Sequence, residues 1–212
     1  YLNPEFNFNN SLLAENYIIN KKFDLALKSL NFISEEDLIF SWYKNKKKSS
    51  IIKKQENEVA ALNFLEKKFD GLRTNNIKIL YDMGGIYKSF EKYDEAIKIY
   101  SKLLDLLDNR SKAYADILYR RGGSFERIGD YETADKDLLD SLNITRENPY
   151  VLNYLAYSWL ERNYKIELSM EMLKEAYDLR KNDPYITDSL GWGYYLINDF
   201  ENAEKYLKKA VE

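Results

Sequence analysis

One pattern of small residues recurs six times along the chain at a nearly constant step. Its first column is Ala26, Ala61, Ala96, Ala134, Ser169 and Ala203, with intervals of 35, 35, 38, 35 and 34 residues. A second column of small residues lies 12 positions earlier, or 13 in the fifth repeat: Ala14, Ser49, Gly84, Gly122, Ala156 and Gly191. A fixed period of this length predicts a stacked repeat array rather than one globular core.

Large residues accompany both columns of small ones. Three positions after the second column stand Tyr17, Ile52, Tyr87, Phe125, Trp159 and Tyr194, and four positions after the first column stand Leu30, Leu65, Tyr100, Leu138, Leu173 and Leu207. In repeat three, Leu80, Met83, Gly84 and Tyr87 follow the i, i+3, i+4, i+7 spacing of one helix face. We therefore expect these large residues in the core, between two short helices per repeat.

The predicted fold is all-α, with six helix-turn-helix repeats over about 8–34, 36–70, 77–110, 113–146, 148–182 and 184–212. Helices are expected near 8–19 and 23–33, 36–54 and 57–69, 77–89 and 93–106, and 113–127 and 131–143. Repeats five and six open with Asn148-Pro149 and Asp183-Pro184, which are typical of a helix N-cap followed by proline in the first turn. Repeat five carries one extra residue in its internal turn, near 163–165.

The segments LYDMGGIYKSFEKYDEAIKIYSKLL (80–104) and DSLGWGYYLINDFENAEKYLKKAVE (188–212) resemble the tetratricopeptide repeat (TPR) family. That resemblance implies a right-handed superhelical solenoid that acts as a non-enzymatic scaffold or adaptor for a protein or peptide. The segments NPYVLNYLAYSWLERN (148–163) and NDPYITDSLGWGYYLINDFENAEKYLKKAVE (182–212) resemble bacterial envelope-associated TPR adaptors more narrowly, a resemblance that covers roughly residues 148–212. They imply a periplasmic or outer-membrane-associated location, with a cytoplasmic one as the alternative.

The amino-acid composition argues against a catalytic or metal-binding site in this chain. Cysteine and histidine are absent, so thiol nucleophiles, histidine triads and the commonest metal ligand are absent too. We predict no catalytic, cofactor or metal site. The net charge of −3 gives no general attraction to nucleic acid, and no apolar run is long enough to span a membrane. The chain starts at Tyr1 and stops at the end of a repeat, so we expect it to be a fragment, here one array over 1–212.

In the TPR family the first helix of each repeat lines a concave groove, and its exposed positions stand at set offsets from the second column. Transferred to this chain, these positions give a basic cluster in repeat two and an aromatic one in repeats five and six. The predicted partner-binding residues are Tyr43, Lys46, Lys47, Lys53, Lys54, Tyr81, Tyr119, Arg120, Arg127, Tyr150, Asn153, Tyr154, Tyr157, Tyr185, Asp188, Trp192 and Tyr195.

Together these clusters suggest an extended ligand with apolar anchors at one end and acidic groups at the other. Plainer interpretations stay open: the lysines can form a solvated helix face, and the tyrosines can pack between neighbouring helices. Other functions are also open. The array can be the regulatory or substrate-recruiting arm of an enzyme whose catalytic domain lies elsewhere, or it can self-associate through uncapped ends. Nucleic-acid binding by the lysines of repeat two is disfavoured by the overall acidity.

Overall fold

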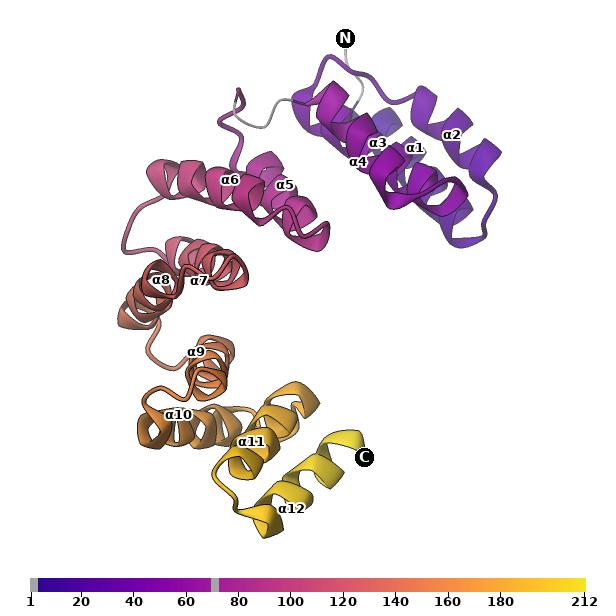
Figure 1. Cartoon of the computed structure of the whole chain (residues 1–212). Helices are drawn as coiled ribbons and strands as arrows, with labels where there is room; N and C mark the ends of the chain where they lie inside the picture. Colours follow the sequence, from indigo (N-terminus) through magenta and orange to yellow (C-terminus); the bar gives the residue numbers. More distant parts are fainter. Residues whose placement is uncertain (1–3, 70–72) are drawn as a thin grey trace. The chain divides into compact units, whose positions relative to one another are not determined.

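The computed structural model describes residues 4–69 and 73–212, and these contain twelve α-helices and no strand (Figure 1). The helices are α1 (Pro4–Ile19), α2 (Phe23–Asn31), α3 (Leu38–Gln55), α4 (Glu58–Lys68), α5 (Ile77–Ser89), α6 (Tyr93–Leu106), α7 (Lys112–Arg127), α8 (Tyr131–Ile144), α9 (Pro149–Glu161), α10 (Ile166–Leu179), α11 (Pro184–Leu196) and α12 (Phe200–Val211). The predicted all-α class and the six helix pairs are confirmed. Residues 1–3 of the predicted array, and residue 70 at the predicted end of repeat two, lie outside the described residues.

The chain divides into two compact bodies, residues 1–83 and 84–212, and the boundary falls inside α5. We call them the N-terminal body and the C-terminal body. Each is a stack of helix pairs of the predicted kind. A single continuous array over all residues stays a prediction.

Helix boundaries follow the local signals in the sequence. The side chain of Asn148 accepts hydrogen bonds from the backbone N–H of Tyr150 and Val151 at 3.1 and 3.4 Å. Asp183 accepts in the same way from Tyr185 and Ile186 at 3.1 and 3.3 Å. Each cap satisfies backbone donors that have no partner within the first helical turn. Both predicted N-caps are thus confirmed, with proline in the first turn of α9 and of α11.

The first column of small residues forms the contact line between paired helices. All six of its members are buried, and Ala203, the most exposed, shows 3% of its surface. In the C-terminal body they lie beside a continuous core that includes Leu138, Leu155 and Leu173. Small side chains let the helix axes approach, and large residues fill the grooves beside them.

The column of large residues that ends the first helices is less buried than predicted. Trp159 is 1% exposed, whereas Tyr17, Ile52, Tyr87, Phe125 and Tyr194 are only half-buried. Tyr17 and Tyr194 pack against the edge of a core cluster rather than within it. Because this column lies in the last turn of each first helix, the aromatic rings cover the open end of the core.

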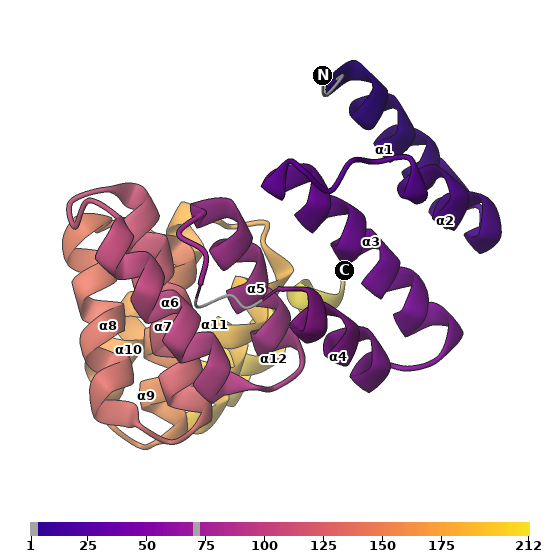
Figure 2. The same ribbon diagram turned by 90° about the horizontal axis from the view of Figure 1, so that it is seen from above.

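Within the C-terminal body the two helices of each repeat take different sides. The first helices α7, α9 and α11 line its inner side, and α6, α8 and α10 line its outer side (Figure 1). Seen from above, the helices of this body stand one behind another (Figure 2). Side chains that project from α7, α9 and α11 therefore share one surface, which we call the inner surface.

Candidate binding site

The lysines of repeat two are paired with acids inside the N-terminal body. Lys46 Nζ lies 2.7 Å from Asp82 Oδ2, and Lys47 Nζ lies 2.6 Å from Glu15 Oε1. Lys53 forms an ion pair with Glu58. These carboxylates neutralise much of the charge that the sequence places on this helix.

Other residues of α3 hold the N-terminal body together. The ammonium of Lys44, a residue 6% exposed, donates to the Ile33 carbonyl at 3.1 Å and lies 2.9 Å from Glu35. The Tyr43 hydroxyl donates to the Ser11 carbonyl at 3.1 Å, and burial raises the pKa of this phenol. Lys54 is exposed at the end of the helix. Among the predicted contact residues of the N-terminal body, Lys53, Lys54 and Tyr81 are exposed.

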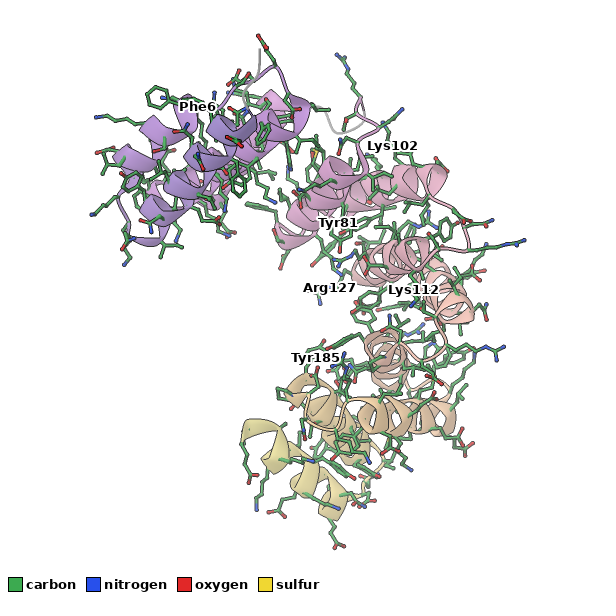
Figure 3. The ribbon with its side chains drawn as sticks, turned by 180° about the vertical axis from the view of Figure 1, so that it is seen from behind. Phe6, Tyr81, Lys102, Lys112, Arg127 and Tyr185 are labelled. Carbon is green, nitrogen blue, oxygen red and sulfur yellow. The ribbon has the colours of Figure 1, made fainter. Side chains whose placement is uncertain are left out.

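The inner surface of the C-terminal body carries a row of exposed aromatic rings. Tyr150 and Tyr157 of α9 are 41% and 37% exposed, and Tyr185 and Tyr195 of α11 are 65% and 48% exposed. Figure 3 shows Tyr185 and Arg127 on this same side of the body. Tyrosine offers a large, rigid contact area with a polar tip and is enriched at interface hot spots.

A second pair of aromatic rings lies between α7 and α9 and is less exposed. Tyr119 and Tyr154 meet edge to face with centroids 5.8 Å apart. The Tyr154 hydroxyl donates to Glu126 Oε2 at 3.0 Å. Burial, followed by the charge of Glu126, raises the pKa of Tyr154 far above its usual range, so this phenol stays protonated.

Trp192 and Glu161 join α11 to α9. The Trp192 ring stacks on Tyr195 at 5.1 Å, and its indole Nε1 donates to Glu161 Oε1 at 2.5 Å. Burial is the main reason that the pKa of Tyr157 is raised, and the negative charges of Glu161 and Asp188 add to it. Both carboxylates therefore act at the same patch of aromatic rings.

Positive charge gathers at the α5–α7 side of the inner surface. The Arg120 guanidinium lies 2.8 Å from Asp116, and Arg127 Nε donates to the Tyr93 hydroxyl at 3.2 Å. Burial lowers the pKa of Lys88, and the charges of Arg120 and Arg127 lower it further. A Cβ at Gly123 would lie 3.2 Å from Lys88 Nζ and 3.4 Å from the Tyr154 hydroxyl, so this glycine leaves room for side chains from both neighbouring helices.

One predicted contact residue is wrongly placed. Asn153 is 1% exposed, so its side chain does not present a surface to a ligand. Its i−3 and i+4 neighbours on α9 are Tyr150 and Tyr157, whose rings are large enough to cover the shorter amide. Conversely, Lys88 and Glu161 occupy the same family offsets but are missing from the predicted set. The offsets alone include them, and their contacts with α7 and α11 distinguish them from the other residues at those offsets.

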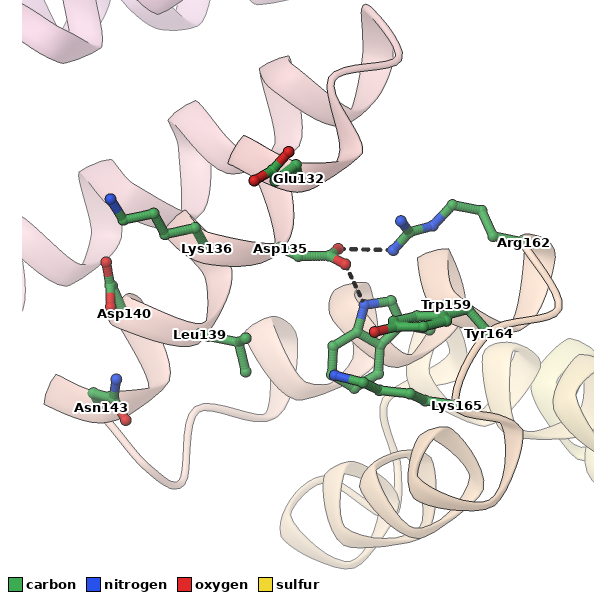
Figure 4. A pocket seen from close by; sticks show the side chains of 10 residues that line it. All are labelled: Glu132, Asp135, Lys136, Leu139, Asp140, Asn143, Trp159, Arg162, Tyr164 and Lys165. Atoms are coloured by element: carbon green, nitrogen blue, oxygen red, sulfur yellow. Dashed lines mark hydrogen bonds and ion pairs between the residues drawn. The ribbon is translucent and has the colours of Figure 1, made fainter.

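A separate hollow opens on the outer side, between α8 and the turn that joins α9 to α10 (Figure 4). It encloses about 680 Å³. Asp135 accepts from Trp159 Nε1 at 2.8 Å and from Arg162 Nη2 at 2.7 Å, and the Arg162 guanidinium lies 4.6 Å from the centroid of the Tyr131 ring. Asp135 and Arg162, two of the charged residues that line this hollow, thus neutralise each other.

No helix in the described parts of the chain is long and apolar enough to cross a bilayer. Among residues 4–69 and 73–212, no group of three or more acidic side chains has the arrangement of a metal site.

Comparisons with known sequences agree with the helix-pair geometry. The sequence profile described as "Tetratricopeptide repeat" matches residues 77–106 and 189–212. A TPR repeat-containing protein of Pseudomonas aeruginosa is 29% identical over 125 residues, which make up 59% of this chain and 19% of that protein. An anaphase-promoting complex subunit of Saccharomyces cerevisiae is 27% identical over 136 residues, 62% of this chain and 15% of that protein. The matched segment therefore spans less than a fifth of either relative.

Solved structures show the same fold. A tetratricopeptide repeat protein from Parabacteroides merdae superposes with a TM-score of 0.73 at 16% identity, over 98% of this chain and 79% of that one. The pilF protein of Pseudomonas aeruginosa superposes with a TM-score of 0.66 at 13% identity, over 95% of this chain and 89% of that one. At these identities the likeness concerns the fold alone.

Proposed function

We propose that this chain is an adaptor whose inner surface in the C-terminal body holds an extended segment of a partner. Residues 77–106 and 189–212 match tetratricopeptide repeats, which bind proteins and peptides and generally serve as non-catalytic scaffolds. The observation that carries this proposal is the row of exposed rings on α9 and α11. Tyr150, Tyr157, Tyr185 and Tyr195 lie on neighbouring first helices, while the outer side of the same repeats carries mixed charges.

The arrangement suits an extended ligand. Successive first helices present similar side chains at regular steps, so a strand-like segment can cross several of them. Side chains already held by the fold, such as Tyr154 and Trp192, lose little conformational freedom when a ligand arrives. Exposed Tyr157 and Tyr185 supply the apolar area that binding removes from water.

Selection from a random peptide display library tests this proposal. The wild-type chain is expected to enrich binding sequences, and a Tyr157→Ser/Tyr185→Ser variant is expected to lose about tenfold or more in affinity for them, because two contact rings are removed. Tyr131→Ser is the matched control, since Tyr131 is 42% exposed but packs beside Arg162 at the outer hollow. Equal binding by the double variant, with its helical content unchanged, would count against the inner surface.

We also propose a bacterial envelope location, supported by the resemblance of segments 148–163 and 182–212 to envelope-associated adaptors. Fractionation of a native source with an antibody against the chain separates this from the cytoplasmic alternative. The alternative role is that of a recruiting arm of an enzyme, which would use the same inner surface. A catalytic domain encoded elsewhere in the full reading frame would favour this alternative.

The pairing of the repeat-two lysines with acids supports the proposal that this chain does not bind nucleic acid. Self-association through the end helices stays a proposal, and light scattering over a range of concentrations tests it.

A further inference from the structure

We propose that the wall formed by α9 and α11 selects ligands with a basic side chain, above all arginine, which docks among the aromatic rings with its guanidinium against Glu161. This inference rests on the proposed function, because it names the chemistry that the inner surface recognises. It is carried by three tryptophan–carboxylate contacts, two of which already include a cation.

The first two contacts are complete within the chain. In the N-terminal body, Asp82 Oδ2 accepts from Trp42 Nε1 at 2.9 Å and from Lys46 Nζ at 2.7 Å. At the outer hollow, Asp135 accepts from Trp159 Nε1 through one oxygen and from Arg162 through the other (Figure 4). In both places an indole N–H and a cation share one carboxylate.

The third contact lacks its cation. Glu161 Oε1 accepts from Trp192 Nε1 at 2.5 Å, and no ammonium or guanidinium group pairs with Glu161 among the described residues. The other group that interacts with this carboxylate is the uncharged hydroxyl of Tyr157. Unlike the other two contacts, this one lies on the surface where the proposed ligand binds.

The surrounding sequence strengthens the charge argument. Neither α9 nor α11 contains a single Lys or Arg, and Glu161 and Asp188 are their only charged residues. Both are exposed. Two carboxylates on a wall without positive charge attract a cationic ligand and repel an acidic one.

The rings favour arginine over a simple ammonium. A planar guanidinium stacks on an aromatic face and donates several N–H groups to a carboxylate at the same time. The chain itself holds Arg162 in this manner, with its guanidinium 4.6 Å from the Tyr131 centroid and 2.7 Å from Asp135. Tyr157 and Tyr185 supply exposed faces on the same wall, and Trp192, which stacks on Tyr195, contacts Glu161 directly.

The three indole N–H signals of the chain offer a direct test by ¹⁵N–¹H NMR. The protein is titrated with N-acetyl-arginine amide and, separately, with the neutral isostere N-acetyl-citrulline amide. We expect the Trp192 indole signal to shift saturably with the arginine probe, while those of Trp42 and Trp159 stay in place because their carboxylates already hold a cation. The citrulline probe is expected to bind at least about fivefold more weakly, since it lacks the charge.

Glu161→Gln is the decisive variant. Glutamine keeps an acceptor for the Trp192 indole and removes the charge, so the fold is retained and the arginine-dependent shift is expected to fall at least about fivefold. Glu171→Gln, at an exposed acid on α10, is the matched control and should leave the shift unchanged. An unmoved Trp192 signal, equal binding of citrulline, or an unchanged response in Glu161→Gln overturns the proposal.

The display selection keeps the two proposals separable. Enriched peptides that lack basic residues and bind the Glu161→Gln protein as tightly as wild type would overturn the arginine site and leave the peptide-binding function intact. Failure to enrich any peptide counts against the function itself, and the indole titration still decides whether the arginine site exists.

Discussion

At Gly84 the two helices of repeat three approach so closely that a Cβ would overlap the ring of Tyr100. Where the corresponding small residue is Ala14 or Ala156, the partner across the helix pair is Leu30 or Leu173. Gly122 and Gly191 also face leucines, because a Cβ added there would lie 3.1 Å from Leu138 and 2.9 Å from Leu207. Glycine therefore marks the places where the paired helices approach most closely, whether the partner is tyrosine or leucine. Close packing of this kind leaves no room for an added methyl group.

Gly84→Ala is accordingly expected to lower the free energy of unfolding by about 1–3 kcal/mol through overpacking. Gly85→Ala is the matched control, because no atom lies within 4 Å of its added Cβ. That change should raise the free energy of unfolding by about 0.5–1 kcal/mol, since alanine loses less backbone entropy than glycine in a helix. Urea unfolding of both variants measures the difference.

A second substitution checks the cause. If the clash with the ring is responsible, adding Tyr100→Leu to Gly84→Ala should recover part of the loss, because it recreates the pairing of Ala14 with Leu30. Additive losses in the double variant would show that the clash with the Tyr100 ring is not the cause.

Buried polar contacts were beyond prediction at this scale. Arg121 donates to both oxygens of Asp137 at 2.7 and 2.8 Å and to the Ser101 hydroxyl at 3.0 Å, which ties α6, α7 and α8 together. Asp137 is 2% exposed. In the sequence it is one of many acids on a helix, and only its position opposite Arg121 distinguishes it.

At the scale of elements, the turns inside five of the six repeats share one backbone feature, whereas in repeat two Glu56 and Asn57 keep negative φ. Lys21, Glu91, Gly129 and Asn198 all have positive φ, between 57° and 83°. In repeat five the longer turn has two such residues, Asn163 and Lys165. The extra residue predicted there carries Tyr164 and Lys165 over the Trp159 ring, with Lys165 Nζ 4.3 Å from its centroid.

Glycine relieves the strain of this conformation, whereas a residue with a Cβ maintains it. Glu91→Gly is therefore expected to raise the free energy of unfolding by about 1 kcal/mol, and Gly129→Ala to lower it by about the same amount. Thermal unfolding of the two single variants measures both changes. Shifts of the same sign would show that the turn conformation is not the cause.

At the scale of the whole molecule, phenols that are partly withdrawn from water predict lower stability at alkaline pH. Burial is the largest cause of the raised pKa values of Tyr43, Tyr119, Tyr154, Tyr157 and Tyr194. In the unfolded chain the same groups lose their protons near pH 10. Above that pH the unfolded state binds fewer protons than the folded state, so the free energy of unfolding falls as pH rises.

Tyr154→Phe isolates one of these groups. At pH 7 the variant should be less stable by about 1–2 kcal/mol, because the hydrogen bond to Glu126 is lost. Between pH 10 and 11 this gap should narrow by up to about 1.4 kcal/mol per pH unit, since phenylalanine has no proton to lose. Urea unfolding at a series of pH values measures the gap, and a constant gap would contradict the assignment.

Much of the architecture was readable before any coordinates. The helix pairs, with their turns, caps and columns of small residues, depend on contacts between residues within about 20 positions of each other. A periodic sequence pattern is sufficient to predict such contacts. The exposed rings of repeats five and six were predicted from the helix positions that the resemblance to TPR proteins implies. Their offsets within a helix determine the side from which they project.

The tertiary structure alone decided which charges are neutralised. Lys46 and Lys47 look like an open basic patch in the sequence, yet Asp82 and Glu15, on other helices, pair with them. Only the fold shows that Glu161 accepts a hydrogen bond from the Trp192 indole and forms no ion pair with a cation among the described residues. Charge pairing depends on distances of a few ångströms between residues about 30 positions apart, and a repeat pattern does not encode those distances.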